Sequence, residues 1–518
     1  MLNRIFGEKT HLYLHLLGLS GIAFGIPFNK VVMSVSMMFI VLNLFLEADF
    51  KSYWNHLKQN KLYLLILGFF LLHVVALLWT SNMEYAFHDL NSKLPLLVIP
   101  TILAAKPVSQ RKHLEIILLV FTSSVVLISI LNYGLYQHWI GDVKYNDIRG
   151  LSHFSSHVRF SIIVSMTMAI CIYFFQYVSL KKRMLFLVII LWLLFYTLYS
   201  QVISGLITMI SIFVTYWIYF LWEKSKIIAV FPLFLGVLSF VAIVFWAFTP
   251  TGFNFEKDID FSAKSAEGNC YAHIPDLISP ETGEPIYIYI CKKELVRNWS
   301  KYSSIAFDSV DLKGQKISET IVRYLSSKKL RKDANGLSQL SKEEIKDIEN
   351  GITSANHKGL LGRLYGLKYQ LINVKDPNGH SLLERLEYWK TGIQIASSNL
   401  LIGVGTGDVQ DSFNQKYEEN HSLLKEGKRR RAHNYYLTVL ITFGIIGFLY
   451  FVYIIGSHLL TNIHTNEILG VVFMVVILVS FLIEDTIETQ TGVTFFALFY
   501  GLFSYKYSER KRNEDTCD

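Results

Sequence analysis

Residues 184–222 read MLFLVIILWLLFYTLYSQVISGLITMISIFVTYWIYFLW and contain no charged side chain. The stretch consists of two apolar runs, 184–200 and 203–222, with a short break at Gln201. A helix needs about 20 apolar residues to cross the hydrocarbon core of a bilayer, and each run is close to that length. The stretch therefore predicts a pair of transmembrane helices joined by a tight turn.

The composition of the whole chain supports the same fold class. Of 518 residues, 52% are hydrophobic, 14% are aromatic and only 17% are charged. An ordinary soluble domain carries about 25% charged residues. The mean hydropathy is +0.35. These values disfavour a purely soluble enzyme and predict an all-α polytopic membrane protein.

A scan for apolar segments of membrane-spanning length gives twelve candidates. The segment 94–105 is short and contains Pro95 and Pro100, so it is either a span or a tilted or re-entrant segment. The N-terminus has a basic start but no cleavage site, so we expect a retained first span. The candidates are 11–28, 31–47, 61–79, 94–105, 114–135, 158–178, 184–200, 203–222, 227–249, 434–456, 468–483 and 491–505.

The distribution of Lys and Arg predicts the orientation. Seventeen of them fall in the segments that are inside if the N-terminus is inside, whereas the short outer loops hold four, Lys30, Lys93, Lys144 and Arg149. The positive-inside rule then places both termini in the cytoplasm. The predicted organisation is a nine-span region at 1–249, a large outer domain at 250–433, three spans at 434–505 and a basic tail at 506–518.

The net charge of +8 is explained by this sided distribution, and we expect no nucleic-acid partner. The four cysteines are too few for a disulfide scaffold and show no metal-ligand spacing. Cys270 and Cys291 both lie in the outer domain, where disulfides are permitted. A bridge between them and two separate thiols are both open readings.

The outer domain has the local patterns of a small α+β insertion. The segment IYIYI at 286–290 favours a strand, and the residues before it, 271–285, are rich in turn formers. Ser341 with Glu344 has the spacing of a helix-capping box, and Gly351 is a stop signal.

The end of the outer domain carries the candidate chemistry. The segment 382–398 reads as an amphipathic helix with Arg385 and Trp389 four residues apart on one face. The glycines of 403–407 then form a tight turn, and a second helix begins near Asp408.

His433 and Asn434 follow where the chain re-enters the membrane. A charged Arg385, a titratable His433 and flexible backbone N–H groups are thus expected near the outer interface. That combination suits a lipid-linked phosphate substrate.

In this region the sequence resembles the O-antigen ligase and polymerase superfamily. The resemblance is strong over about 70 residues, and the twelve-span layout extends it loosely over the chain. The residues that carry it are Arg385 with Trp389, the Gly-Val-Gly-Thr-Gly turn at 403–407, His433-Asn434, Leu437 and the segment FGIIGF at 443–448.

The resemblance implies a C-type glycosyltransferase in a bacterial inner membrane, with its large loop in the periplasm. Such an enzyme moves a glycan from undecaprenyl pyrophosphate to a hydroxyl of lipid A core, a glycan or a protein, inverts the anomeric centre and uses no metal or cofactor. The two implied catalytic residues are Arg385, which holds the pyrophosphate, and His433, which activates the acceptor. Guanidinium and imidazole suit these roles, because one forks onto phosphate and the other has a pKa near 7.

The family usually carries a second arginine in a Ser-Arg-Gly-like element, and here Ser204-Gly205 lacks it. Arg159 at the outer end of the sixth span is the expected substitute, although it could also snorkel to the interface. The run 429–431 is either a phosphate attractor or solvated charge. The predicted substrate-binding residues are Arg159, Trp389, Gly403, Gly405, Asn434, Glu484 and Glu488.

The carboxylates of the outer turn, Glu484, Asp485 and Glu488, either position the acceptor, share the proton taken by His433, pair with Arg159 or Arg385, or cap helix ends. The glycine turn resembles a phosphate cradle only weakly and lacks the Lys-Ser/Thr of a nucleotide loop.

Three functions are carried forward. The first is a ligase with a lipid A core acceptor, and the second is a polymerase or protein O-oligosaccharyltransferase that uses the same donor. The third, a polysaccharide transporter, is disfavoured because the polar groups gather at one outer face rather than at the midplane. Membrane lipids are expected partners in every case.

Overall fold

The structure, a computed structural model, describes residues 7–141, 148–248, 259–312 and 314–505. The predicted basic tail at 506–518 and Lys144 lie outside these residues. The chain forms two compact units. Unit 1 is built from residues 1–144, 149–232 and 385–518, and unit 2 from residues 145–148 and 233–384.

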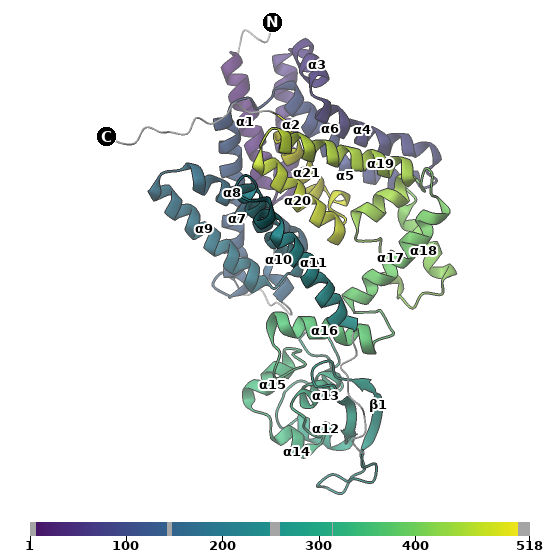
Figure 1. The fold of residues 1–518 in the computed structure, drawn as a ribbon. Coiled ribbons are helices and arrows are strands. Elements are labelled where there is room, and N and C mark those ends of the chain that lie inside the picture. The colour runs from purple at the N-terminus through teal and green to yellow at the C-terminus, as the bar shows by residue number, and fades with distance from the viewer. Residues whose placement is uncertain (1–6, 142–147, 249–258, 313, 506–518) are drawn as a thin grey trace. The chain divides into compact units, whose positions relative to one another are not determined.

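Unit 1 consists of helices (Figure 1). They are α1 (Glu8–Gly25), α2 (Lys30–Glu47), α3 (Phe50–Gln59), α4 (Lys61–Val75), α5 (Met83–Lys93), α6 (Pro95–Ala105), α7 (Arg111–Tyr136), α8 (His157–Tyr177), α9 (Leu180–Ser200), α10 (Ile203–Leu221), α18 (Val409–Glu419), α19 (Tyr435–His464), α20 (Ile468–Ile483) and α21 (Gln490–Leu502). The chain passes between the units within α11 (Lys226–Phe248) and α17 (Ser381–Ser398).

Eight helices of the described residues are long and apolar enough to cross a membrane: α2, α4 with the turn that follows it, α7, α8, α9, α10, α11 and α19. The other four predicted spans also coincide with helices, but each of these is either too short or not apolar enough to be counted with the eight. They are α1, α6, α20 and α21. The prediction of an all-α polytopic membrane protein is confirmed. The number of twelve spans stays a prediction.

Helix α6 shows why the segment 94–105 is ambiguous in the sequence. It has 11 residues and so rises about 16 Å, roughly half of a hydrocarbon core of about 30 Å, and whether it counts as a span stays a prediction. Leu94 keeps helical dihedral angles, so α5 leads directly into α6, and Pro95 occupies the first position, where its missing N–H costs least. Helix α6 is buried against α3, α4 and α21.

The core of unit 1 brings α8 and α10 close together beside α20. A Cβ atom at Gly205 would lie 2.7 Å from Cβ of Ser161 on α8, so only a glycine fits at that contact. Small residues allow two membrane helices to pack with their backbones close. The Ser204-Gly205 element therefore has a packing role here.

The glycine turn and α19 fit together through their backbones. Gly444 interrupts α19 with φ +62°, and a Cβ atom there would lie 2.3 Å from the carbonyl carbon of Leu401. At Gly403, a Cβ atom would lie 2.4 Å from the carbonyl of Thr442. The N–H of Gly405 donates to the carbonyl of Thr442 at 3.0 Å. The turn therefore fills the break in α19.

Unit 2 has a small α+β fold, but its bounds differ from the outer domain predicted at 250–433, because residues 385–433 belong to unit 1. Strands β1 (Ala272–Ile278) and β2 (Pro285–Ile290) pair antiparallel, which confirms the strand at 286–290. The turn-rich segment before it contains β1 as well as the turn, because pairing with β2 outweighs the low strand propensity of its polar residues and proline. The helices are α12 (Lys292–Trp299), α13 (Ile317–Ser327), α14 (Ala334–Ser338), α15 (Lys342–Glu349) and α16 (Gly359–Asn373).

Two further predictions for unit 2 are answered. The capping box of Ser341 and Glu344 is present at the start of α15, and Gly351 follows its end with φ +68°. Cys270 and Cys291 are free thiols, so the disulfide is not formed.

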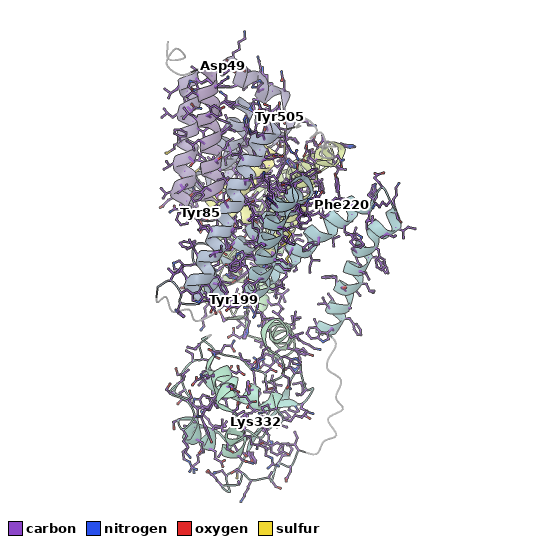
Figure 2. All side chains as sticks on the ribbon, turned by 90° about the vertical axis from the view of Figure 1, so that its left-hand side faces the viewer. Asp49, Tyr85, Tyr199, Phe220, Lys332 and Tyr505 are labelled. Carbon is purple, nitrogen blue, oxygen red and sulfur yellow. The ribbon has the colours of Figure 1, made fainter. Side chains whose placement is uncertain are left out.

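Lys332, labelled in Figure 2, is 4% exposed, and its backbone hydrogen-bonds to the edge of β2.

Candidate functional site

Helix α17 presents the first part of the site and fixes the loop before α19. The indole N–H of Trp389 donates to the carbonyl of Ala432 at 2.9 Å, and the hydroxyl of Tyr388 donates to the carbonyl of Lys428 at 2.8 Å. Arg385, one turn earlier, donates to the carbonyl of Ile483 at 2.5 Å. The predicted face of Arg385 and Trp389 thus joins two loops at one end of unit 1.

His433 lies at the end of that loop in an unusual backbone conformation. Its φ is +48°, a value that side-chain-bearing residues seldom adopt. The next residue, Asn434, caps α19 by accepting the N–H of Leu437 at 3.1 Å. The imidazole is 28% exposed, and its Nδ1 is buried with no hydrogen-bond partner among the described residues.

The turn between α20 and α21 brings carboxylates to this imidazole. Oε2 of Glu484 lies 3.9 Å from Nδ1 of His433, and Oε1 of the same residue lies 3.1 Å from Nη2 of Arg159. Arg159 is at the first turn of α8, so the site draws on three separate parts of unit 1. The ion pair is one of the alternatives that the sequence left open for Glu484, and a substrate role for Arg159 stays a prediction.

The site carries an excess of unpaired positive charge. Among the described residues, Arg385 and Arg430 have no carboxylate within ion-pair distance, and Arg430 is exposed. Burial lowers the pKa of His433, and the neighbouring arginines lower it further against the opposing effect of Glu484. His433 is therefore neutral near pH 7, the form in which an imidazole accepts a proton.

Asp485 holds the backbone of His433. Its Oδ2 accepts the N–H of His433 at 2.9 Å, and its Oδ1 accepts the hydroxyl of Thr438 at 2.7 Å. Burial, together with the charge of Glu488, raises the pKa of Asp485 to about 6. By accepting these two hydrogen bonds, the buried carboxylate fixes the loop that carries His433 to the first turn of α19.

Next to Asp485 lies a largely buried chain of four charged side chains, those of Asp89, Lys93, Glu488 and Arg431. Oε2 of Glu488 lies 2.8 Å from Arg431, and Oε1 lies 3.0 Å from Lys93, which also binds Asp89 at 2.6 Å. Although burial raises it, the two cations lower the pKa of Glu488 to about 2. The guanidinium of Arg431 also lies over the ring of Tyr85, labelled in Figure 2, at 4.8 Å.

The structure brings together most of the residues that the sequence singled out. His433 lies beside Arg385, Arg159, Glu484, Trp389 and Asn434 through the contacts above. Glu488 is close in sequence but is enclosed by its two cationic partners.

Gly403 and Gly405 lie apart from this group, against residues 441–444, about two turns into α19. Their N–H groups already bind the carbonyls of Asn399 and Thr442. This packing gives no support to a phosphate cradle at the glycine turn.

Two residues of the buried chain were not recognised from the sequence, where Lys93 counted only as an outer-loop charge. The available signal was the spacing of Asp89 and Lys93, four apart in a helical segment, which places opposite charges on one face. Arg431 was read with its neighbours as either a phosphate attractor or solvated charge. In the structure it is mostly enclosed and forms an ion pair with Glu488.

Comparison with known families bears on this site directly. A family model described as O-antigen ligase matches residues 339–452, a range that includes Arg385, Trp389, His433 and Asn434. The match confirms the resemblance found in the sequence. Arg159 and the turn at 484–488 lie outside the matched range. A search of curated proteins finds no match to the chain.

Proposed function

Because residues 339–452 match the O-antigen ligase family, we propose that the chain transfers a glycan en bloc from undecaprenyl pyrophosphate to a hydroxyl acceptor at the outer face of a bacterial inner membrane. The observation that carries the proposal is the neutral, partly exposed His433 placed among Arg385, Arg159 and Arg430 with a carboxylate beside its Nδ1.

The unpaired guanidinium groups supply what the donor requires. A lipid pyrophosphate carries several negative charges and gains another on the phosphate oxygen that leaves the anomeric carbon as that C–O bond breaks. Arg385, which has no carboxylate partner among the described residues, can fork onto two phosphate oxygens. These charges act where negative charge develops, so the proposed reaction proceeds without a metal ion.

The imidazole supplies the other half of the reaction. With its Nδ1 facing Glu484, His433 uses Nε2 to take the proton of the acceptor hydroxyl. The oxygen then bonds to the anomeric carbon as the electron pair of the breaking C–O bond moves to the pyrophosphate. Attack from the face opposite the leaving group inverts the anomeric centre.

Glu484 has two tasks in this scheme. Its position 3.9 Å from Nδ1 favours the tautomer that leaves Nε2 free, and its charge stabilises the imidazolium formed after proton transfer. Its second oxygen holds Arg159, so the base and an arginine keep a fixed relation. Arg159 thereby provides the second cation that the Ser204-Gly205 element lacks.

The proposed setting is the inner membrane, with both termini in the cytoplasm and unit 2 in the periplasm, as the distribution of Lys and Arg predicts. Lipid A core is the proposed acceptor. A second glycan chain or a protein hydroxyl is the alternative, because the donor chemistry is the same in each case.

The test is transfer of a labelled glycan from undecaprenyl pyrophosphate by the purified protein, with lipid A core, a second lipid-linked glycan and a Ser/Thr peptide offered side by side. We expect one acceptor to be used, and His433→Ala to abolish the product. His421→Ala is a matched control, because His421 has the same φ of +48° in the preceding loop but is exposed and outside the site. No product with any acceptor would favour the transporter.

A further inference from the structure

His433 needs a device that holds it, because its backbone lies in the left-handed region without being a glycine. Such conformations persist only where the surroundings fix them, and they concentrate at functional sites. The imidazole lies 5.9 Å from the ring of Tyr388 and 3.9 Å from Glu484, but its Nδ1 makes no hydrogen bond among the described residues. Directional restraints therefore come from the backbone of residues 431–434.

Asp485 provides one restraint from the turn between α20 and α21. It accepts the N–H of His433 at 2.9 Å and the hydroxyl of Thr438 at 2.7 Å, so it ties the residue before α19 to the first turn of that helix. Asp485 is only 7% exposed, which keeps water from competing for either bond.

Glu488 provides the second restraint through Arg431, which lies two residues before His433. One oxygen of Glu488 lies 2.8 Å from Arg431, and the other lies 3.0 Å from Lys93. Lys93 is 1% exposed and is itself fixed by Asp89 on α5. Because Glu488 cannot move without breaking its ion pair with Lys93, its contact with Arg431 gives the loop a fixed anchor.

From these contacts we infer that Asp485 and Glu488 are positioning residues, which hold the loop at 431–434 so that the His433 imidazole faces Glu484 and the arginines. Neither touches a substrate in this scheme. The catalytic part of the inference rests on the proposed function, whereas the orientation of the imidazole does not.

The first measurement follows orientation without any reaction. Diethyl pyrocarbonate modifies unprotonated imidazoles, and peptide mass spectrometry reads its rate at each histidine of the full-length protein in detergent. If the restraint is lost, the 28% exposed side chain approaches full exposure, so we expect roughly threefold faster modification of His433 in Asp485→Asn and in Glu488→Gln. The exposed His421 serves as the internal reference.

The second measurement is kinetic. A displaced base weakens the chemical step and leaves donor binding intact, so kcat should fall by about 10- to 100-fold in both variants with little change in KM. Glu488→Gln and Arg431→Gln should be non-additive, because each breaks the same contact. Should a charge variant fail to fold, Thr438→Val provides a milder test of the same restraint, because it removes only the hydrogen bond from the Thr438 hydroxyl to Asp485.

A matched control separates positioning from general destabilisation. Glu467→Gln breaks another partly buried ion pair, with Arg111 at 2.9 Å, at the opposite end of α20. It should leave both the modification of His433 and kcat near the parent values.

Equal losses in Glu467→Gln, or unchanged modification and kcat in Asp485→Asn and Glu488→Gln, would overturn the inference. If the parent protein transfers no glycan while the modification rates change as expected, the proposed function fails and the positioning role stands.

Discussion

The charge of Glu484 is expected to set the pH range in which His433 can act as a base. Replacing Glu484 by Gln keeps the size of the side chain but removes the carboxylate 3.9 Å from Nδ1. The imidazolium then loses its nearest negative partner while Arg385, Arg430 and Arg159 remain. The pKa of His433, already lowered by burial, falls further.

The size of the effect follows from the distance. Two unit charges 3.9 Å apart interact by about 4 kcal/mol at an effective dielectric constant of 20 and by about 1 kcal/mol in bulk water. Since 1.36 kcal/mol corresponds to one pH unit, the acid limb should move to lower pH by about one to three units. The imidazole is 28% exposed, so solvent screening places the expected shift near the lower end, about one unit.

The assay is kcat/KM for glycan transfer between pH 5 and 9. Activity is lost on the acid side as His433 becomes protonated, so a lower pKa extends activity to lower pH, while the weaker base reduces the plateau by about tenfold. Glu418→Gln is the control, since Glu418 is an exposed carboxylate paired with Arg429 outside the site. An acid limb that stays in place, or moves to higher pH, would refute the role of Glu484.

Three further outcomes are expected. Arg385→Ala should reduce kcat/KM for the donor by about 100-fold and Arg385→Lys should recover only part of it, because ammonium lacks the planar fork; equal activity of the two variants in the transfer assay would argue against bidentate binding. Because the pKa of Asp485 is raised to about 6, folding favours its protonated form, and this stabilisation is complete below about pH 4 and lost as the pH rises through 6. Thermal denaturation in detergent should therefore rank Asp485→Asn more favourably against the parent at pH 7.5 than at pH 4.5, and the reverse ranking would contradict the pKa. Gly444→Ala should destabilise unit 1 by about 1–3 kcal/mol or more, because its φ is +62° and a Cβ atom would lie 2.3 Å from the backbone of Leu401; Gly456→Ala, with nothing within 4 Å, should be near neutral in the same melts.

Local patterns were sufficient for much of the fold. The apolar run lengths predict the membrane helices, and the Ser341–Glu344 spacing predicts the start of α15, because each depends on residues within a few turns of one another. The extent of the helix that carries Arg385 and Trp389 is likewise confirmed.

The remainder of the site depends on contacts between distant segments. Glu484 meets Arg159 across 325 positions, and no local pattern distinguishes that pairing from a helix cap. The glycine turn was ambiguous for the same reason. Its spacing predicts a tight turn and only weakly a phosphate cradle, and the contacts with α19 around Gly444 show which carbonyl groups its N–H donors bind.

The buried chain of charges also imposes an order on biogenesis. Lys93 and Glu488 are almost 400 positions apart, and at about 5–20 residues per second a ribosome makes the second some 20 to 80 seconds after the first. Throughout that interval the ammonium of Lys93 lacks one of its two carboxylate partners, so hydration by water is favoured over burial. The ion pair of Glu488 with Lys93 and Arg431, and with it the fixed loop that carries His433, can form only after the turn between α20 and α21 has been synthesised.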